Sequence, residues 1–298
     1  MAERSHRRQW LSRNVVHPIE AAGVYVMLAL SRLAGPVLAS NAGGWLARTI
    51  GPHLGISRRA RHNLALVMPE LDEAARERVV RAMWDNLGRT VAEYPHLERI
   101  FAERVEFVGD DNVALAKAHG RSVMFFTTHG ANWEVCPLVA RSKGMPIHVV
   151  YRPANNPWVD DLINRCRADG VKSLVPKGAA GAKQVMRLLA AGEHFGMLLD
   201  QKQNDGITVP FFGREAMTTF APAAFARRYG AMLMPIRIER LGPARLRVTA
   251  EKPVEQARGG DRDADLRETM ARVNAVFERW IRERPGEWLW LHRRWPDS

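Results

Sequence analysis

The sequence predicts an α/β fold, in which a mostly parallel, twisted sheet is covered by helices and preceded by a helical N-terminal extension that anchors the chain to a membrane. Short apolar segments alternate with helical patterns from residue 105 to residue 199, as in parallel strands joined by helices. A hydrophobic content of 46% over 298 residues suffices for a full core. A basic N-terminus precedes an apolar stretch. We therefore expect a membrane-associated helical segment at 1–50 and an α/β domain at 51–298.

The N-terminal segment begins MAERSHRRQWLSRN, and an apolar stretch interrupted by Ser31 and Arg32 runs from Ile19 to Ala39. Its length matches a bilayer span of about 20 residues, but an arginine near the centre costs roughly 2.5 to 3.5 kcal/mol in a membrane. No small-residue cleavage site of a secretory signal follows it. The pattern favours an embedded anchor or an interfacial helix with basic flanks. A buried core helix is the alternative.

The first long helix is predicted from Asp72 to His96, because apolar residues recur every four positions from Ala75 to Val91. Asp72 is a suitable N-cap, and Pro95 ends the helix. The alternating elements that follow are, in order, a strand at Val105–Val108, a helix from Asp111, a strand at Ser122–Thr127, a helix from Trp133, a strand at Ile147–Tyr151, a helix at Trp158–Ala168, a strand at Ser173–Val175, a helix at Ala179–Ala191 and a strand at Phe195–Leu199.

The last third of the chain changes character. A helix at Phe220–Tyr229 precedes a predicted strand pair, Leu233–Arg240 and Arg245–Ala250, whose turn carries Gly242 and Pro243. An amphipathic helix is predicted at Arg262–Glu283. The tail RPGEWLWLHRRWPDS is rich in tryptophan and arginine, which favours either an interfacial membrane anchor or packing of the tail on the sheet.

The segment SVMFFTTHGANWEV, residues 122–135, carries the strongest chemical signal. Along one continuous helix, His129 and Glu134 would lie about 140° apart and could not cooperate. The apolar strand, Gly130 and a good N-cap at Asn132 instead place His129 in a loop and Glu134 in the first turn of the next helix. There the carboxylate is stabilised by about 0.3 to 1 kcal/mol. We expect it to stay ionised and to accept a hydrogen bond from one imidazole nitrogen, which leaves the other nitrogen as a base. A core histidine beside an unrelated glutamate is the alternative.

The formal net charge of +12 comes mostly from arginine, which supplies 37 of the 44 basic residues. Such a surface suits nucleic acid, anionic lipid headgroups or an acidic carrier protein. The sequence has no zinc-finger spacing and no aromatic RNA-binding motif, so we expect no nucleic-acid partner. Cys136 and Cys166 are predicted to be reduced core thiols, with Cys136 directed away from the histidine loop. No GxSxG elbow and no cluster of zinc ligands is present.

Four short blocks follow predicted strands in order: HGANWE, VVYRP, MLLDQ and LMPI. This ordered set resembles the lysophospholipid acyltransferase superfamily. The glutamate of the first block, the DQ at Asp200 and Gln201, the YRPANNP segment, the VPFFGREA run and the WLWLHRRW ending make the chain similar to the late lipid A acyltransferases of Gram-negative bacteria. The similarity extends over nearly the whole chain, including the N-terminal anchor. A Phe-Pro-Glu-Gly type block, which glycerolipid members carry, is missing.

The resemblance implies roles for particular residues. His129 would deprotonate a hydroxyl of a lipid acceptor, and Glu134 would orient it. Arg152 would contact a lipid phosphate or the thioester oxyanion, with a surface ion pair as the alternative. Asp200 is expected to position Arg152, Lys177 or a sugar hydroxyl, or to serve a structural hydrogen bond, and Gln201 shares that ambiguity.

Two further substrate contacts, Phe211 and Arg214, are expected in the VPFFGREA run. Its aromatic residues would line an acyl-chain groove, although ordinary core packing is equally typical of them. The reaction implied is acyl transfer from acyl carrier protein to a lipid A precursor at the cytoplasmic face of the inner membrane, without metal or prosthetic group. Acylation of another polar lipid, such as a glycosylated phospholipid or an ornithine lipid, and non-catalytic lipid binding are the alternatives.

Overall fold

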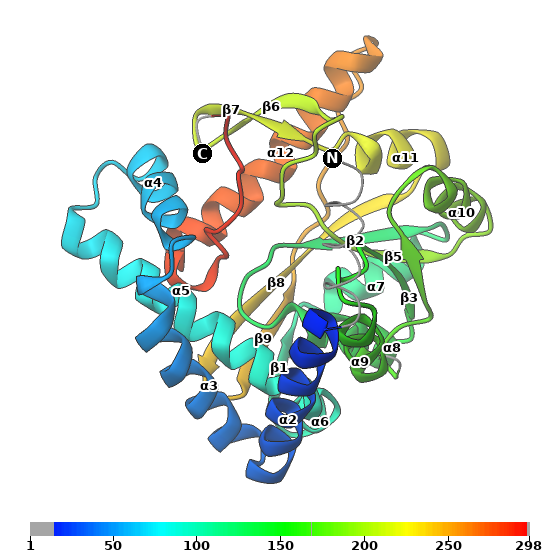
Figure 1. The fold of residues 1–298 in the computed structure, drawn as a ribbon. Coiled ribbons are helices and arrows are strands. Elements are labelled where there is room, and N and C mark those ends of the chain that lie inside the picture. The colour runs from blue at the N-terminus through cyan, green and yellow to red at the C-terminus, as the bar shows by residue number, and fades with distance from the viewer. Residues whose placement is uncertain (1–14, 168, 297–298) are drawn as a thin grey trace, which may run out of the picture.

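A seven-stranded sheet runs through the computed structural model, which describes residues 15–296 except residue 168 (Figure 1). The strand order is β1-β9-β8-β2-β5-β3-β4, and a separate hairpin is formed by β6 and β7. The strands are β1 (Val105–Val108), β2 (Val123–Thr127), β3 (Ile147–Tyr151), β4 (Ser173–Pro176), β5 (His194–Leu198), β6 (Ile207–Phe211), β7 (Arg214–Thr218), β8 (Met232–Gly242) and β9 (Arg245–Ala250).

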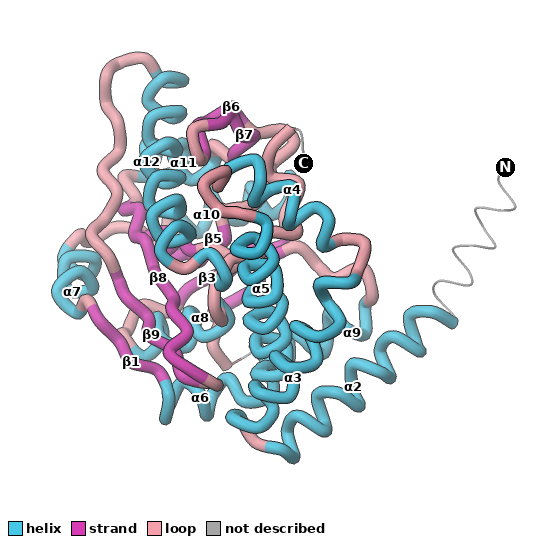
Figure 2. Tube along the Cα trace, turned by 90° about the vertical axis from the view of Figure 1, so that its left-hand side faces the viewer, coloured by secondary structure: helices cyan, strands magenta, loops and turns pink. Residues whose placement is uncertain are grey.

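Helices cover both faces of the sheet (Figures 1 and 2). They are α2 (His17–Ala34), α3 (Pro36–Ile50), α4 (Ser57–Val67), α5 (Glu73–Glu93), α6 (Leu97–Arg104), α7 (Asp110–Ala118), α8 (Cys136–Ser142), α9 (Pro157–Arg167), α10 (Ala179–Ala190), α11 (Ala221–Tyr229) and α12 (Arg262–Glu283). Short 3-10 turns lie at Gly51–His53, Tyr94–His96, Trp133–Val135 and Pro285–Glu287. The predicted mixed α/β architecture is confirmed. The helices α2 and α3 fall within the helical segment expected at 1–50, of which residues 1–14 lie outside the described part of the chain. The helices α4 and α6 and the β6–β7 hairpin were not predicted from the sequence.

The central strands are parallel, as expected from the alternation of strands and helices. β2 pairs in parallel with β5 on one side and with β8 on the other, whereas β9 runs antiparallel to β8. Every residue of β2 is buried, because helices cover both of its faces. Thr127 lies opposite Leu198 in the register of β2 with β5, so the loops that leave these two strands begin side by side.

The apolar N-terminal stretch does not form one long helix. Gly35 has a φ of 77° and precedes Pro36, and this turn separates α2 from α3. None of the helices in the described part of the chain combines the length and hydropathy needed to cross a bilayer. Instead, α3 packs closely on α5, where a Cβ at Gly43 would lie 2.4 Å from the carbonyl oxygen of Gly88. In Figure 2, α2 extends away from the sheet along one side of the molecule.

The tryptophan-rich tail packs inside the protein. Trp288, Trp290 and Trp295 are at most 2% exposed, and the tail runs between α4 and the sheet (Figure 1). The alternative of a membrane-anchoring tail is therefore wrong for these side chains. Phe211 is fully buried against Trp288 and Trp295, and it stacks on Trp295 with ring centroids 5.5 Å apart.

Candidate active site

His129 lies in the loop after β2, where the sequence placed it, and its partner is Asp200. The Nδ1 atom of His129 lies 2.8 Å from Oδ1 of Asp200, and the backbone N–H of His129 donates to Oδ2 at 2.9 Å. The indole Nε1 of Trp288 also donates to Oδ2, at 2.7 Å. Burial opposes ionisation of Asp200, but the facing His129 and these hydrogen bonds hold the pKa of Asp200 below its usual range. Asp200 is therefore an ionised, fully enclosed acceptor.

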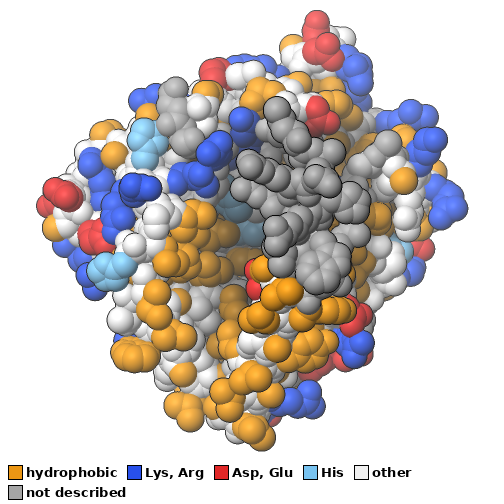
Figure 3. All heavy atoms as spheres, viewed as in Figure 1, with side chains coloured by type: hydrophobic (Ala, Val, Ile, Leu, Met, Phe, Trp, Pro, Cys, Tyr) orange, Lys and Arg blue, Asp and Glu red, His pale blue; other side chains and the backbone are white. Residues whose placement is uncertain are grey.

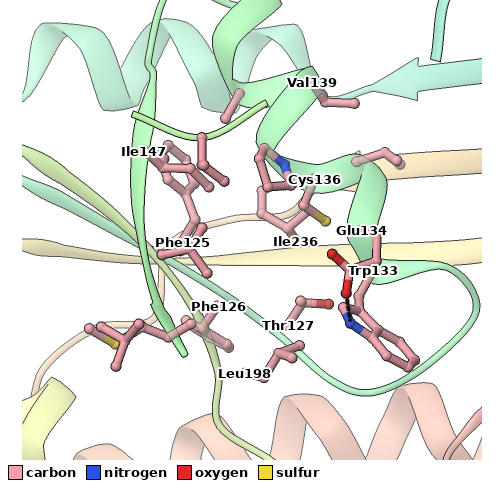
Figure 4. Close-up of a pocket in the computed structure, with 18 of the residues that line it drawn as sticks. Phe125, Phe126, Thr127, Trp133, Glu134, Cys136, Val139, Ile147, Leu198 and Ile236 are labelled. Atoms are coloured by element: carbon pink, nitrogen blue, oxygen red, sulfur yellow. Dashed lines mark hydrogen bonds between the residues drawn. The ribbon is translucent and has the colours of Figure 1, made fainter. Parts of the chain in front are cut away.

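The predicted hydrogen bond between Glu134 and His129 is a wrong expectation, because the carboxylate faces other groups. Arg167 binds both of its oxygens, with Nε 2.6 Å from Oε2, and the Tyr94 hydroxyl donates to Oε1 at 2.6 Å. The indole of Trp133 donates to the same oxygen at 2.9 Å (Figure 4). Burial opposes ionisation of Glu134, but the guanidinium of Arg167 keeps the pKa of Glu134 lowered. Glu134 thus anchors a buried ion pair at the edge of the site.

The loop that carries His129 is held from behind by α5. The carbonyl oxygen of Ala131, a residue with a φ of 47°, accepts hydrogen bonds from Thr90 Oγ1 at 2.9 Å and Asn86 Nδ2 at 3.3 Å. Asn132 caps the following turn as predicted, since its side chain accepts a hydrogen bond from the backbone N–H of Glu134. These contacts from a distant helix fix the direction in which the imidazole points.

A largely apolar cavity of about 370 Å³ opens beside the imidazole. Figure 4 shows Phe125, Ile147 and Ile236 around this space, with Trp133 and Glu134 to one side. Its size lies within the usual range for ligand sites, roughly 300 to 1,000 Å³. His129, Gln201, Arg152 and Lys177 all line it, so four of the predicted site residues share one cavity with Glu134.

The remaining predicted contacts lie elsewhere. Phe211 belongs to the buried aromatic core and does not line this cavity. Arg214 is exposed at the start of β7, where its Nε donates to the backbone oxygen of Leu66 at 3.2 Å. Asp200 binds His129 and Trp288 rather than the expected Arg152 or Lys177.

Cys136 lines the cavity, contrary to the prediction that it points away. Burial raises the pKa of its thiol to about 12, so it is protonated at neutral pH and unsuited to act as a nucleophile. Its place on the wall is that of a small apolar side chain.

Sequence reasoning missed Arg167, Trp288 and His292 as parts of this site. Arg167 ends α9, 33 residues after Glu134. Trp288 and His292 come from the tail, whose backbone pairs with the histidine loop at Gly130 and Trp288. The dense aromatic and basic pattern of the tail was the only local signal.

Residues 8–297 match the family of bacterial lipid A biosynthesis acyltransferases. The chain belongs to this family. It is 29% identical over 253 residues to the lipid A biosynthesis lauroyltransferase of Escherichia coli K12, covering 80% of this chain and 79% of the relative. The palmitoleoyltransferase of the same organism is 26% identical and covers 79% and 77%. The myristoyltransferase is 24% identical and covers 91% and 83%. The acyltransferase family that the sequence resembled is thereby shown. In this chain, His129 lines a cavity with largely apolar walls.

Proposed function

We propose that this chain transfers a fatty acyl group from an acyl carrier protein thioester to a hydroxyl of a lipid A precursor, with His129 as the general base. The proposal rests on what surrounds the imidazole of His129. Its Nδ1 faces a buried, ionised carboxylate, and the same ring lines an apolar cavity. Membership of the lipid A acyltransferase family supports the class of reaction.

The chemistry follows from the tautomer. An ionised Asp200 can only accept a hydrogen bond, so Nδ1 of His129 carries the hydrogen and the lone pair lies on Nε2. Nε2 takes the proton of the acceptor hydroxyl while its oxygen attacks the thioester carbonyl carbon. The carbon–sulfur bond then breaks, and the imidazolium returns the proton to the leaving sulfur. General-base catalysis of this kind contributes about 10²- to 10⁴-fold in rate.

The acyl chain of the donor would occupy the cavity beside His129. The cavity lies between the sheet and α8. Its walls include Phe125, Ile147 and Ile236 from the sheet and Val139 from α8. Burying a chain there is favourable by about 0.8 kcal/mol for each methylene group. This groove replaces the one expected around Phe211.

Cations at the carboxyl ends of β3 and β4 suit the charged parts of the substrates. Arg152 and Lys177 are exposed and line the cavity, so they are placed to contact a lipid phosphate or the thioester oxyanion. The net charge of +12 would favour docking of an acidic carrier protein. Glu134 keeps a supporting role, since it fixes Arg167 and Trp133 at the edge of the cavity.

Membrane association is proposed through α2 and α3. Figure 3 shows apolar side chains gathered over these helices in the lower part of the view. We define the apolar N-terminal surface as the exposed residues Ile19, Val26, Leu30, Leu33, Leu38, Trp45, Leu46 and Ile50. Such a surface suits shallow insertion among lipid headgroups. Its place would be the cytoplasmic face of the inner membrane, where acyl carrier protein is present.

Replacement of His129 by alanine tests the proposal. Purified enzyme would be incubated with an acyl carrier thioester and a lipid A precursor, and the acylated lipid measured by mass spectrometry. We expect a loss of about 10²-fold or more in the His129→Ala enzyme. The matched control is His62→Ala, because His62 is exposed on α4. Transfer that persists within about tenfold of normal would show that His129 is not the base. No turnover in the unmodified protein would favour lipid binding without catalysis.

A further inference from the structure

The second ring nitrogen of His129, Nε2, is contacted by the side chain of Gln201. The proposed transfer gives this side chain no role. The amide Nε2 of Gln201 lies 3.0 Å from Nε2 of His129 and 2.9 Å from Nε2 of His292. The two histidine rings themselves are 5.4 Å apart between centroids. Gln201 therefore bridges the histidine of the β2 loop and a histidine of the C-terminal tail.

The direction of the amide follows from Asp200. Because Nδ1 of His129 donates to that carboxylate, Nε2 of a neutral ring has only a lone pair to offer. A lone pair needs a donor, and the amide nitrogen of Gln201 is one. The amide nitrogen also lies 3.3 Å from Nδ1 of His129. That ring nitrogen cannot accept a hydrogen bond, because it carries a hydrogen that it donates to Asp200.

Nε2 of His292 accepts a hydrogen bond from the second N–H of the same amide group. Burial, followed by the positive charge that His129 can carry, lowers the pKa of His292 to about 4, so this ring is neutral at physiological pH. A neutral ring can accept at Nε2 while Nδ1 holds the hydrogen. Both hydrogens of the Gln201 amide group are thus directed at lone pairs of imidazole rings.

We propose that Gln201, held by His292, is a positioning residue that caps the lone pair of the base until the acceptor hydroxyl displaces it. This inference rests on the proposed acyl transfer. A lipid acceptor brings contacts from its headgroup that offset the loss of the capping hydrogen bond, whereas a water molecule brings none. The cap therefore suppresses hydrolysis of the acyl thioester more than transfer to the lipid.

The first test reads the tautomers in the intact protein. Long-range proton–nitrogen NMR correlation of histidine side chains should find His129 and His292 both with hydrogen on Nδ1 and a bare Nε2. Assignment would use the single substitutions His129→Gln and His292→Gln. A hydrogen on Nε2 of His292 would overturn the proposal, because the Gln201 amide could not then donate to it. This measurement does not depend on catalysis.

The second test measures the ratio of thioester hydrolysis to acyl transfer onto the lipid. Acyl carrier thioester hydrolysis without acceptor, and transfer with saturating acceptor, would be compared in the unmodified enzyme, Gln201→Ala and His292→Ala. We expect the ratio of hydrolysis to transfer to rise about fivefold in Gln201→Ala, which corresponds to about 1 kcal/mol for the lost cap. His292→Ala should move the ratio in the same direction, and the control His62→Ala should leave it unchanged.

The outcomes distinguish failure of the proposed Gln201 cap from failure of the proposed acyl transfer. If the unmodified enzyme transfers acyl groups but the ratio stays constant in Gln201→Ala, the cap is refuted while the acyltransferase proposal stands. If the unmodified enzyme transfers none, the proposed function has failed. A general disturbance of the site would lower both rates together and leave their ratio constant, so that result also counts against the cap.

Discussion

Asp200 receives both the backbone N–H and the ring Nδ1 of His129, so one carboxylate fixes the loop and the imidazole together. The register of β2 with β5 explains this pairing. Thr127 lies opposite Leu198, and His129 and Asp200 each follow two residues later. The third hydrogen bond, from Trp288, ties the C-terminal tail to the same carboxylate.

Replacement of Asp200 by asparagine should abolish most of the activity. Asparagine is neutral, so it would neither select the Nδ1–H tautomer nor stabilise the imidazolium that the proposed transfer forms. We expect kcat for acyl transfer to fall about 10²- to 10⁴-fold, with a smaller change in KM. Steady-state kinetics with saturating acceptor would measure this. Trp288→Phe is the matched control, since it removes one hydrogen bond to Asp200 and keeps the charge; equal losses in the two variants would contradict the role given to the carboxylate.

Replacement of Glu134 by glutamine should act mainly on stability. Its carboxylate is buried and pairs with Arg167, whose side chain is only 20% exposed. Breaking such a pair leaves a largely buried guanidinium without its counter-charge and costs about 3 kcal/mol. Urea unfolding would measure the loss. Assayed at a urea concentration well below its unfolding midpoint, the variant should keep kcat within about tenfold of normal. If the folded variant instead lost as much activity as His129→Ala, Glu134 would be the residue that orients His129.

The cavity wall offers a test of the acyl site at Gly196. A Cβ at this position would lie 2.6 Å from Cδ1 of Ile147, and both residues line the cavity. Gly196→Ala should therefore narrow the space and lower kcat/KM for long acyl chains more than for short ones. The change would be about 1 to 3 kcal/mol for the longest chains. Competition between acyl carrier thioesters of different length measures it.

Gly242→Ala is the matched control for the cavity, because nothing lies within 4 Å of a Cβ built there. The control should leave the chain-length preference unchanged. An unchanged preference in Gly196→Ala as well would place the acyl chain outside this cavity.

The apolar N-terminal surface should govern binding to lipid. Leu33 is 86% exposed and Trp45 is 58% exposed. Replacing both by glutamine removes about 2 kcal/mol of apolar burial per residue on a membrane, so binding to anionic vesicles should weaken at least about tenfold. Vesicle co-sedimentation would measure this, with Leu115→Gln on α7 as control, since Leu115 is also exposed. Equal binding by all variants would exclude this surface as the contact.

Local sequence patterns determined the strands Val105–Val108 and Ile147–Tyr151, the helix Arg262–Glu283, the N-caps at Asp72 and Asn132, and the loop position of His129. These features depend on residues close together in the chain, and side-chain periodicity and capping report on such neighbours directly. The family resemblance also came from the order of short blocks along the chain.

Only the tertiary structure decided which carboxylate serves His129. Glu134 is five residues away in sequence, yet its turn directs it to Tyr94 and Arg167, whereas Asp200 arrives through the pairing of two strands. The burial of Trp288 and Trp290, the place of Phe211 in the core and the bridge from Gln201 to His292 have the same origin. Contacts between segments 33 or more residues apart, such as these, depend on strand register and helix packing, which no local pattern specifies.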